Sequence, residues 1–389
     1  MSFAPRKLIQ DRWLTALGRV EYGSITFVGP DGSSWSFKGP QPGPTAQFGI
    51  RDWGVIERLV ARGDIGLGED FIASAWDSDD LEALISFFLL NLEQLEGFAH
   101  GNLANRLLFV LHNSLVRRNS LSGSRRNIEA HYDVGNDFYS LWLDETMTYS
   151  SALFEGEPRA LAEAQRRKYG RIISKLDRSR GSILEIGCGW GGFAEQAADA
   201  DYKVTGLTIS PSQHAFATKR LGSHAEIRLQ DYRKVEGTFD SIVSIEMFEA
   251  VGERYWPQYF NTIAGRLARG GKAVIQAIVV RDELFAGYRT RSDFIRHYVF
   301  PGGMLPSLAR FREEAERAGL KLLGSFSFGE DYARTLREWS ARMRARETEI
   351  LALGHDQQFL RNWQFYFGIC AAAFSVKRTD VVQAEVVHA

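Results

Sequence analysis

Cysteine is scarce in this sequence of 389 residues. Only Cys188 and Cys370 occur, and their wide separation argues against both a disulfide framework and a cysteine-rich zinc site. So few cysteines suit a reducing cytoplasm, which is the location that we expect. No metal site is predicted, because His131 and Asp133 have no further ligands spaced around them.

An excess of charge and a long apolar segment are also missing. The 47 Lys and Arg against 48 Asp and Glu give a net charge of −1, which argues against a nucleic-acid binder. The N-terminal "MSFAPRKLIQDRW" lacks the apolar core of a secretory signal. The most apolar stretch, "LEALISFFLLNLEQLEGF", contains three glutamates and falls short of the roughly 20 apolar residues of a membrane span. We therefore expect neither export nor a span.

What the sequence does contain is typical of a globular protein: 44% of its residues are hydrophobic and 24% are charged, over a length that suits two domains. Near the N-terminus, "GSITFVG" and "SWSFKG" joined by "PDGS" predict a β-hairpin. "DWGVIERLVARG" and "DLEALISFFLLNL" have helical spacing, with Asp52 and either Asp79 or Asp80 placed to cap them. These residues predict a small α+β domain.

A boundary follows at residues 113–127, "NSLVRRNSLSGSRRN", which lack any apolar period. We expect an N-terminal domain at 1–115, a linker at 116–127 and a second domain at 128–389. The two arginine pairs of this stretch suit either a solvated linker or a patch that meets anionic lipid headgroups, and composition does not decide between these alternatives.

From about residue 160, helices and strands alternate. The strands expected are "SILEIG", "YKVTGLTI", "AEIRLQDY", "FDSIVSI" and "GGKAVIQAIVV", and the helices "LAEAQRRKYGRIISKL", "GGFAEQAADA" and "SPSQHAFATKRL". Such alternation predicts a doubly wound parallel sheet that binds ligands at the carboxyl ends of its strands. Farther on, "NWQFYFGICAAAF" has aromatic residues at strand-like spacing and predicts a buried strand.

The stretch "LEIGCGWGGF" fits two cofactor fingerprints. Gly187, Gly189 and Gly192 match a dinucleotide site, whereas Gly187, Gly189 and Gly191 match an S-adenosylmethionine site. A dinucleotide site needs an acid about 20 residues after its first glycine, and "VTGLTISPSQ" has none at the strand end. Glu185, before the loop, would repel a pyrophosphate but attract the cationic amino-acid portion of S-adenosylmethionine. The residues therefore favour the methyl donor.

Six blocks carry a resemblance to one family: "HYDVGNDFYSLWLDETMTYSSALF", "LEIGCGWGGFAEQAA", "LTISPSQ", "FDSIVSIEMFEAVGERYW", "DFIRHYVFPGGMLPS" and "YARTLREW". In this order, over about residues 127–375, they resemble the cyclopropane-fatty-acyl-phospholipid synthase family, which includes mycolic acid cyclopropane synthases and fatty-acid C-methyltransferases. The resemblance implies an α/β fold, a class I S-adenosylmethionine methyltransferase with a Rossmann-like sheet and a smaller N-terminal α+β domain. Residues 1–115 resemble the lipid-associated domain of bacterial members.

The resemblance also implies which residues contact S-adenosylmethionine. Tyr149 and Ser150 would contact the methionine end beside Gly187, Gly189 and Gly191. The ribose would be held by Thr208, Ile209 and Gln213, whose hydrogen bonds would replace those of an acid. The adenine would face Gln230, Asp231 and Ile245.

In the same family a bound bicarbonate serves as the base, held in a polar cage. The resemblance places Ser151, Glu249, Gln276, Ile278 and Tyr332 in that cage. Many members have Cys where Ser151 stands and His where Gln276 stands, although Ser and Gln can still donate a hydrogen bond to an anion. Cys370 matches a cysteine marked as active-site in the family, and we expect either a packed core thiol or a direct catalytic role.

The function implied is transfer of a methyl or methylene group from S-adenosylmethionine to the double bond of unsaturated phospholipid acyl chains, forming a cyclopropane. A methyl- or methylene-branched product is the alternative, with a partner reductase for the saturated branch. A non-catalytic lipid-binding protein and a nicotinamide oxidoreductase are remoter alternatives. The substrate implies peripheral association with the inner face of the membrane, and a homodimer would be compatible with the sequence.

Overall fold

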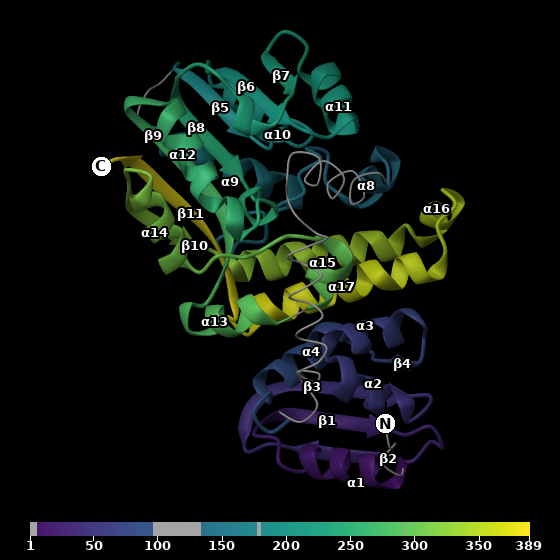
Figure 1. Ribbon diagram of the computed structural model, residues 1–389. Coiled ribbons are helices and arrows are strands. Elements are labelled where there is room, and N and C mark those ends of the chain that lie inside the picture. Colours follow the sequence, from purple (N-terminus) through teal and green to yellow (C-terminus); the bar gives the residue numbers. More distant parts are fainter. Residues whose placement is uncertain (1–5, 96–133, 177–179, 292) are drawn as a thin grey trace. The chain divides into compact units, whose positions relative to one another are not determined.

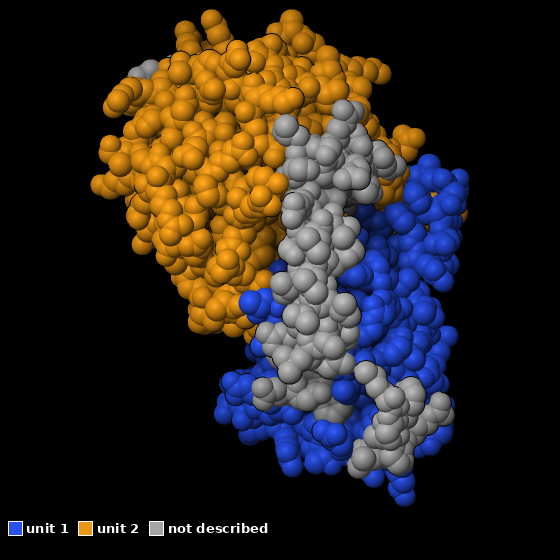
Figure 2. All heavy atoms as spheres, viewed as in Figure 1, with its two compact units in different colours: residues 1–115, 290–299, 351–377 blue, residues 116–289, 300–350, 378–389 orange. Residues whose placement is uncertain are grey.

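The computed structural model describes residues 6–95, 134–176, 180–291 and 293–389, which separate into two units (Figures 1 and 2). The first unit takes its residues from 1–115, 290–299 and 351–377, and the second from 116–289, 300–350 and 378–389. Two segments from the C-terminal part of the chain therefore belong with the N-terminal residues. The expected linker at 116–127, with its arginine pairs, lies outside the described residues, as do His131 and Asp133.

The first unit contains a four-stranded sheet in the order β2-β1-β3-β4. The predicted hairpin is confirmed, since β1 (Tyr22–Val28) and β2 (Ser34–Lys38) pair antiparallel with Phe27 opposite Trp35. The other strands are β3 (Gln41–Ile50), which pairs parallel with β1, and the short β4 (Trp76–Asp77). Buried aromatic rings fill the core, among them Trp13, Phe27 and Phe48.

Helices complete this unit: α1 (Arg6–Leu17), α2 (Gly54–Arg62), α3 (Asp64–Ile72), α4 (Leu81–Leu90), a π-helical turn η4 (Ile295–Val299) and α17 (Gln357–Ser375). Of the two candidate caps for α4, the structure selects Asp80, whose side chain accepts a hydrogen bond from the Ala83 N–H. Asp52 accepts one from the Gly54 N–H at the start of α2.

The strand predicted for "NWQFYFGICAAAF" is wrong, because these residues lie within α17. The helix begins at a cap, where Asp356 accepts a hydrogen bond from the Phe359 N–H. It packs against α3 and α4 of the same unit, and most of its aromatic residues are buried. A run that is apolar on all sides has no periodicity to distinguish a helix from a strand, so packing decided the outcome.

The second unit contains a seven-stranded sheet in the order β10-β11-β9-β8-β5-β6-β7. Its parallel part comprises β5 (Ser182–Ile186), β6 (Lys203–Thr208), β7 (Ala225–Leu229), β8 (Phe239–Ile245) and β9 (Leu267–Val280). Antiparallel strands β11 (Thr379–His388) and β10 (Leu320–Ser327) extend it beyond β9. All five predicted parallel strands are confirmed, and with them the α/β fold class.

The helices of the second unit follow the predicted alternation where they flank the glycine loop (Figure 1). They are α8 (Asn136–Trp142), α9 (Leu161–Ser174), α10 (Gly192–Asp199), α11 (Pro211–Leu221), α12 (Trp256–Arg266), α13 (Asp282–Thr290), α14 (Leu308–Arg317) and α15 (Gly329–Ala345), while α16 (Glu347–Ala352) spans the boundary between the units. Short 3-10 turns are η1 (Tyr232–Lys234), η2 (Phe248–Ala250) and η3 (Glu253–Tyr255).

The strand order places a ligand site between β5 and β8. From β5 the chain passes outward to β6 and β7, whereas β8 and β9 lie on the other side of β5. Such a reversal opens a crevice at the carboxyl ends of the two central strands. Glu185 and the glycine loop lie at the end of β5, and Glu246 directly follows β8, so acidic side chains stand on both sides of that position.

Candidate active site

The loop after β5 is built around glycines with positive φ. Gly187, Gly189 and Gly191 have φ angles of 83°, 53° and 87°, a region that only glycine enters without a steric penalty. A Cβ atom on Gly187 would lie 2.7 Å from Cγ of Met247, whereas one on Gly189 would meet no described atom within 4 Å. The backbone at Gly189 is therefore open to the close approach of a ligand.

Glu185, at the end of β5, is a buried acid with unused hydrogen-bonding capacity. Glu185 is only 2% exposed, and its Oε2 atom has no hydrogen-bond partner among the described residues. Burial raises the pKa of Glu185 to about 8, against the opposing charge of Lys168. A buried acceptor without a described partner suits the cationic amino-acid portion of S-adenosylmethionine, and this contact stays a prediction.

Helix α9 contributes Lys168, a functional candidate that sequence reasoning missed. The Lys168 ammonium is fully buried and donates to Oγ of Ser150 at 2.6 Å, while the Gln165 amide donates to the Ser150 carbonyl at 2.9 Å. Burial lowers the pKa of Lys168 to about 7, although Glu246, Asp144 and Glu185 all favour its charged form. Ser150 is thus held by two residues one turn apart on α9.

The centre of the predicted cage is a second missed residue, Glu246. Its Oε1 atom accepts hydrogen bonds from the Ser151 N–H at 2.8 Å and from Nε2 of Gln276 at 2.7 Å. Its Oε2 atom accepts from the Tyr332 hydroxyl at 2.6 Å. Burial raises the pKa of Glu246, and Lys168 and these three hydrogen bonds act in the opposite direction. Three of the five predicted cage residues therefore meet around one carboxylate of the chain itself.

A chain of side-chain amides fixes the orientation of Gln276. Arg171 donates to Oε1 of Gln383 at 2.6 Å, and Nε2 of Gln383 donates to Oε1 of Gln276 at 2.9 Å. An arginine can only donate, so each amide in turn must present its N–H to the next group. The chain ends with Gln276 donating to Glu246, which must therefore act as the acceptor.

The backbone of Glu246 is held in an unusual conformation. Its φ is 49°, and a non-glycine residue in the left-handed region costs about 1–3 kcal/mol. The Glu246 N–H donates to the Gln276 carbonyl at 2.8 Å, so the strained residue is tied to β9. Residues in this conformation persist where the surrounding structure imposes it, and they concentrate at functional sites.

Ser151 and Ile278 contribute backbone groups to the cage. The Ser151 hydroxyl donates to the Ala152 carbonyl at 3.0 Å, while the Ser151 backbone N–H donates to Glu246; a hydrogen bond from this hydroxyl to a bound anion stays a prediction. The Ile278 N–H donates to Oε1 of Glu249. Because the backbone N–H of Ser151 makes the contact with Glu246, having Ser where many family members have Cys does not change that hydrogen bond.

Glu249, on η2, differs from Glu246 in its surroundings. One carboxyl oxygen accepts the Ile278 hydrogen bond, and Oε2 has no partner among the residues that the structure describes. Burial and the nearby charge of Glu246 raise the pKa of Glu249 to about 8. Two carboxyl groups in unequal environments separate into an acid and a base, and here Glu249 holds its proton at neutral pH.

Aromatic rings surround Tyr149, which the sequence placed at the methionine end of the cofactor. The centroid of its ring lies 5.2 Å from that of Trp339 and 5.6 Å from that of Trp142. Trp339 also contacts the ring of Tyr332 at 6.2 Å. The negative faces of such rings stabilise a neighbouring cation. This aromatic cluster, Tyr149, Trp142, Trp339 and Tyr332, connects the predicted cofactor residues with the cage.

The predicted ribose and adenine residues lie at the ends of β6, β7 and β8. Thr208 donates to Oε1 of Gln213 at 2.9 Å, and the Gln230 N–H donates to the Thr208 carbonyl at 2.9 Å. Asp231 accepts two hydrogen bonds from the Arg233 guanidinium. Ile209 directly follows β6, and Ile245 is the last residue of β8. Their contacts with the cofactor stay predictions.

The sequence model that describes mycolic acid cyclopropane synthetases matches residues 119–384. The chain belongs to this family. Within it, the chain is 35% identical to the tuberculostearic acid methyltransferase UfaA1 of Mycobacterium tuberculosis, over 85% of this chain and 80% of that protein. It is 32% identical to the cyclopropane-fatty-acyl-phospholipid synthase of Escherichia coli, over 87% of each.

A solved structure of the family agrees with this membership. Mycolic acid cyclopropane synthase CmaA1, complexed with SAH and CTAB, superimposes with a TM-score of 0.64 at 30% identity, covering 67% of this chain and 97% of that one. The resemblance inferred from the six sequence blocks is thus confirmed, and so is the class I methyltransferase fold. This member of the cyclopropane synthetase family is an S-adenosylmethionine-dependent methyltransferase.

Cys370, the remaining candidate of this methyltransferase, lies on α17 in the first unit. Burial raises the pKa of its thiol, and Asp293 raises it further. A thiol with a raised pKa is a poor nucleophile, which favours the packed-thiol alternative. A catalytic role for Cys370 stays a prediction that these observations do not support.

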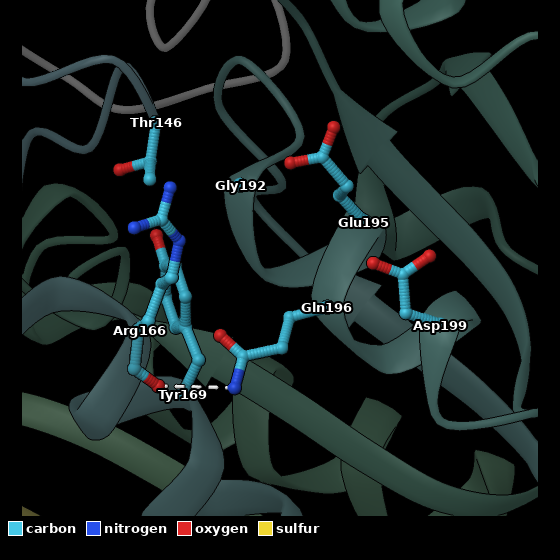
Figure 3. A pocket seen from close by; sticks show the side chains of 7 residues that line it. All are labelled: Thr146, Arg166, Tyr169, Gly192, Glu195, Gln196 and Asp199. Carbon is cyan, nitrogen blue, oxygen red and sulfur yellow. Dashed lines mark hydrogen bonds between the residues drawn. The ribbon is translucent and has the colours of Figure 1, made fainter. Parts of the chain in front are cut away.

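A small hollow of about 90 Å³ lies between α9 and α10 (Figure 3). Figure 3 shows Gln196 on α10 turned towards α9, where its amide donates to the Arg166 carbonyl at 3.0 Å. None of the residues that line it belongs to the predicted cofactor set or cage. We assign it no part in the methyltransferase reaction.

The raised pKa of Glu249 leads to a testable pH dependence. The folded protein keeps the Glu249 proton up to about pH 8, whereas the unfolded chain loses it near pH 4.5, so this group makes the protein less stable as pH rises between these values. Glutamine mimics the protonated carboxyl and does not titrate. Glu249→Gln is therefore expected to be more stable than the unchanged protein at pH 8.5, by up to about 5 kcal/mol, and equally stable near pH 4.5.

Denaturant unfolding across this pH range measures the difference. Glu226 is the matched control, because its hydrogen bond with Arg228 lowers its pKa, so Glu226→Gln should change stability slightly and in the opposite direction. A Glu249→Gln protein whose stability follows the unchanged protein at every pH would show that Glu249 is ionised in the fold.

Proposed function

We propose that this methyltransferase transfers a methyl group from S-adenosylmethionine to the double bond of unsaturated phospholipid acyl chains, and that a cyclopropane is formed. The observation that carries the proposal is the polar cage around Glu246, which stands next to an aromatic cluster. Methylation of an alkene produces a carbocation and then requires a base. The aromatic cluster would stabilise the carbocation, the carboxylates of the cage would supply the base, and both belong to the second unit.

The protein's own residues divide this work. When bound, S-adenosylmethionine supplies an electrophilic methyl group on a positively charged sulfur. Glu185 would orient the cationic end of that molecule, and Lys168 and Gln165 hold Ser150 in place beside it. The rings of Tyr149, Trp142 and Trp339 would exclude water and stabilise the cation that develops on the acyl chain.

A branched product is the second candidate, and two observations support it. Ser151 and Gln276 stand where many family members have Cys and His, and one similar relative is named a tuberculostearic acid methyltransferase. If a proton leaves a chain carbon instead of the new methyl group, the product is a branched alkene. A partner reductase would then be needed to make a saturated methyl branch.

If phospholipid acyl chains are the substrate, the reaction takes place at a membrane surface. No helix among the described residues is both long and apolar enough to cross a bilayer. We propose that the protein reaches phospholipid acyl chains by peripheral association with the inner face of the membrane, and vesicle flotation with anionic and neutral lipids tests this contact.

Mass spectrometry of membrane lipids tests the activity. In cells that produce the protein and have unsaturated phospholipids, acyl chains should gain the mass of one CH2 group, and fragmentation should locate it at the former double bond. Chains labelled from methyl-deuterated methionine retain three deuterium atoms in a branch formed by loss of a proton from a chain carbon, but two in a cyclopropane or in a methylene branch, and fragmentation distinguishes these last two products. Lipids that stay unchanged while the purified protein binds S-adenosylmethionine would support the non-catalytic alternative instead.

A further inference from the structure

The cage predicted for bicarbonate is already filled by groups of this chain. The Ser151 N–H, the Gln276 amide and the Tyr332 hydroxyl all donate to the Glu246 carboxylate, at 2.8, 2.7 and 2.6 Å. The two other members of the cage, the Ile278 N–H and Glu249, bond to each other. Each of the five groups that were expected to hold bicarbonate therefore has a partner within the chain.

A bicarbonate ion does not fit this arrangement. It would have to compete with Glu246 for its donors, and it would lie beside that carboxylate as a like charge, which is unfavourable at short distance in a buried site. A carboxylate and a bicarbonate both present two oxygens on one carbon, so the Glu246 side chain can satisfy the same donors without a bound ion.

We propose that the Glu246 carboxylate is the built-in base of this methyltransferase and takes the place of a bound bicarbonate. The inference rests on the proposed function and identifies the base that removes a proton after the methyl transfer. In the first step, the double bond forms a carbon–carbon bond to the methyl group while the bond from that methyl to sulfur breaks, leaving a carbocation next to the new branch.

The second step uses Glu246. Its carboxylate takes a proton from the new methyl group, and the electron pair of that C–H bond closes the ring onto the cationic carbon. If the proton comes from a neighbouring carbon, the same electron pair forms a double bond and leaves a branch. In either case Glu246 becomes a neutral carboxylic acid, and it returns the proton to solvent before the next turnover.

The surroundings of Glu246 suit a base better than those of Glu249. Glu246 accepts from three donors and lies near the Lys168 ammonium. Glu249 accepts from a single described donor and is destabilised as an anion by Glu246. The amide chain from Arg171 also directs an N–H, and not a carbonyl oxygen, towards Glu246. Donors of this kind stabilise an anion and keep it oriented.

The position of Glu246 in the chain explains how the carboxylate reaches the cage. The residue directly follows β8, its φ is 49°, and its N–H is bonded to the Gln276 carbonyl. A glycine would adopt this backbone conformation more readily. Replacing Glu246 with glycine should therefore preserve the turn while it empties the cage, which makes it a suitable test variant.

The experiment compares two variants with the unchanged protein, using purified protein, vesicles of an unsaturated phosphatidylethanolamine and S-adenosylmethionine in buffer freed of carbon dioxide. We expect full activity from the unchanged protein, with or without added sodium bicarbonate. Glu246→Gln should lose activity by roughly 100-fold or more and should not respond to bicarbonate, because the amide still fills the cage. Glu246→Gly should be equally impaired but recover by at least roughly tenfold when bicarbonate is added.

Binding of S-adenosylmethionine, measured by calorimetry, shows that each variant is folded, and Glu226→Gln serves as an exposed glutamate control. Activity of the unchanged protein that depends on added bicarbonate would overturn the inference, and so would undiminished activity of Glu246→Gln. A Glu246→Gly protein that binds the cofactor but does not respond to bicarbonate would also count against it. An unchanged protein that binds the cofactor yet forms no product would instead overturn the proposed function.

Discussion

Glu185→Gln is expected to weaken the binding of S-adenosylmethionine by roughly 30-fold to 1,000-fold, the range that follows from removing one partner of a buried charge pair. Glu185 is 2% exposed and its Oε2 atom has no described partner, so the ligand's cation would be its main counter-charge besides Lys168. Glutamine keeps the size of the side chain but cannot carry the negative charge.

Calorimetric titration with two ligands measures this loss and locates the contact. S-adenosylhomocysteine has the same amino group but no charge on sulfur. If Glu185 contacts the amino-acid portion, both ligands should lose affinity equally. A loss confined to S-adenosylmethionine would place Glu185 near the sulfonium, and equal affinities in the variant and the unchanged protein would remove it from the site.

The pKa of Glu185 adds a second signature to the same experiment. Because burial raises that pKa to about 8, the carboxyl is largely protonated in the unliganded protein at pH 7 and must lose its proton to pair with a cation. Binding of the cationic ligand at pH 7 should therefore release a proton from Glu185. Glu185→Gln should lack that Glu185-linked release, while Glu195→Gln, a half-exposed glutamate paired with Arg220, should retain it.

Trp339→Ala is expected to lower the free energy of unfolding of the second unit by about 3–5 kcal/mol, the usual cost of truncating a large buried aromatic residue. Trp339 is fully buried and its ring contacts those of Tyr149, Trp142 and Tyr332. The substitution leaves a cavity between the predicted cofactor residues and the cage, so catalytic turnover should fall as well.

Trp339→Phe is the matched variant, because it keeps an aromatic face while it removes part of the volume. We expect it to lose less stability than Trp339→Ala and to retain more activity. Thermal unfolding gives the stability of each variant, and product formation at saturating cofactor gives the turnover. If alanine and phenylalanine variants were equally active at a temperature where both are folded, the aromatic face would have no role in stabilising the cation.

Much of the second unit could be predicted because its signals are local. The glycine loop after β5 and the cap at Ser210, which accepts a hydrogen bond from the Gln213 N–H, can be recognised from neighbouring residues alone. Alternation of strands and helices then indicates a parallel sheet, and such a sheet places its ligands at the carboxyl ends of its strands. The fold class needed no long-range information.

The strand predicted within α17 was wrong because the local pattern of that segment does not distinguish a strand from a helix. Between Trp363 and Phe374 the residues are apolar in almost every direction, so a period of two and a period of 3.6 fit about equally well. The cap at Asp356 lies several residues earlier and was not used as a signal. Packing against α3 and α4 favours the helix, and the residues of the segment alone do not predict that packing.

Glu246 could have been suspected from the sequence, since an acid that directly follows a strand of such a sheet points to the ligand site. The hydrogen-bond partners of Glu246, however, cannot be predicted from the residues near it in sequence. Ser151, Gln276 and Tyr332 lie 95, 30 and 86 positions away along the chain. Lys168 likewise belongs to a helix whose spacing describes only an ordinary amphipathic face.

The sequence by itself therefore determined the cofactor class, the sheet and the family, because each depends on short blocks and their order. Only the tertiary structure decided that the cage is occupied by a carboxylate of the chain. The physical reason is that hydrogen-bond donors become a site only when they converge on the same acceptor, and here α15, β9 and the loop after Tyr149 meet at Glu246 through folding alone.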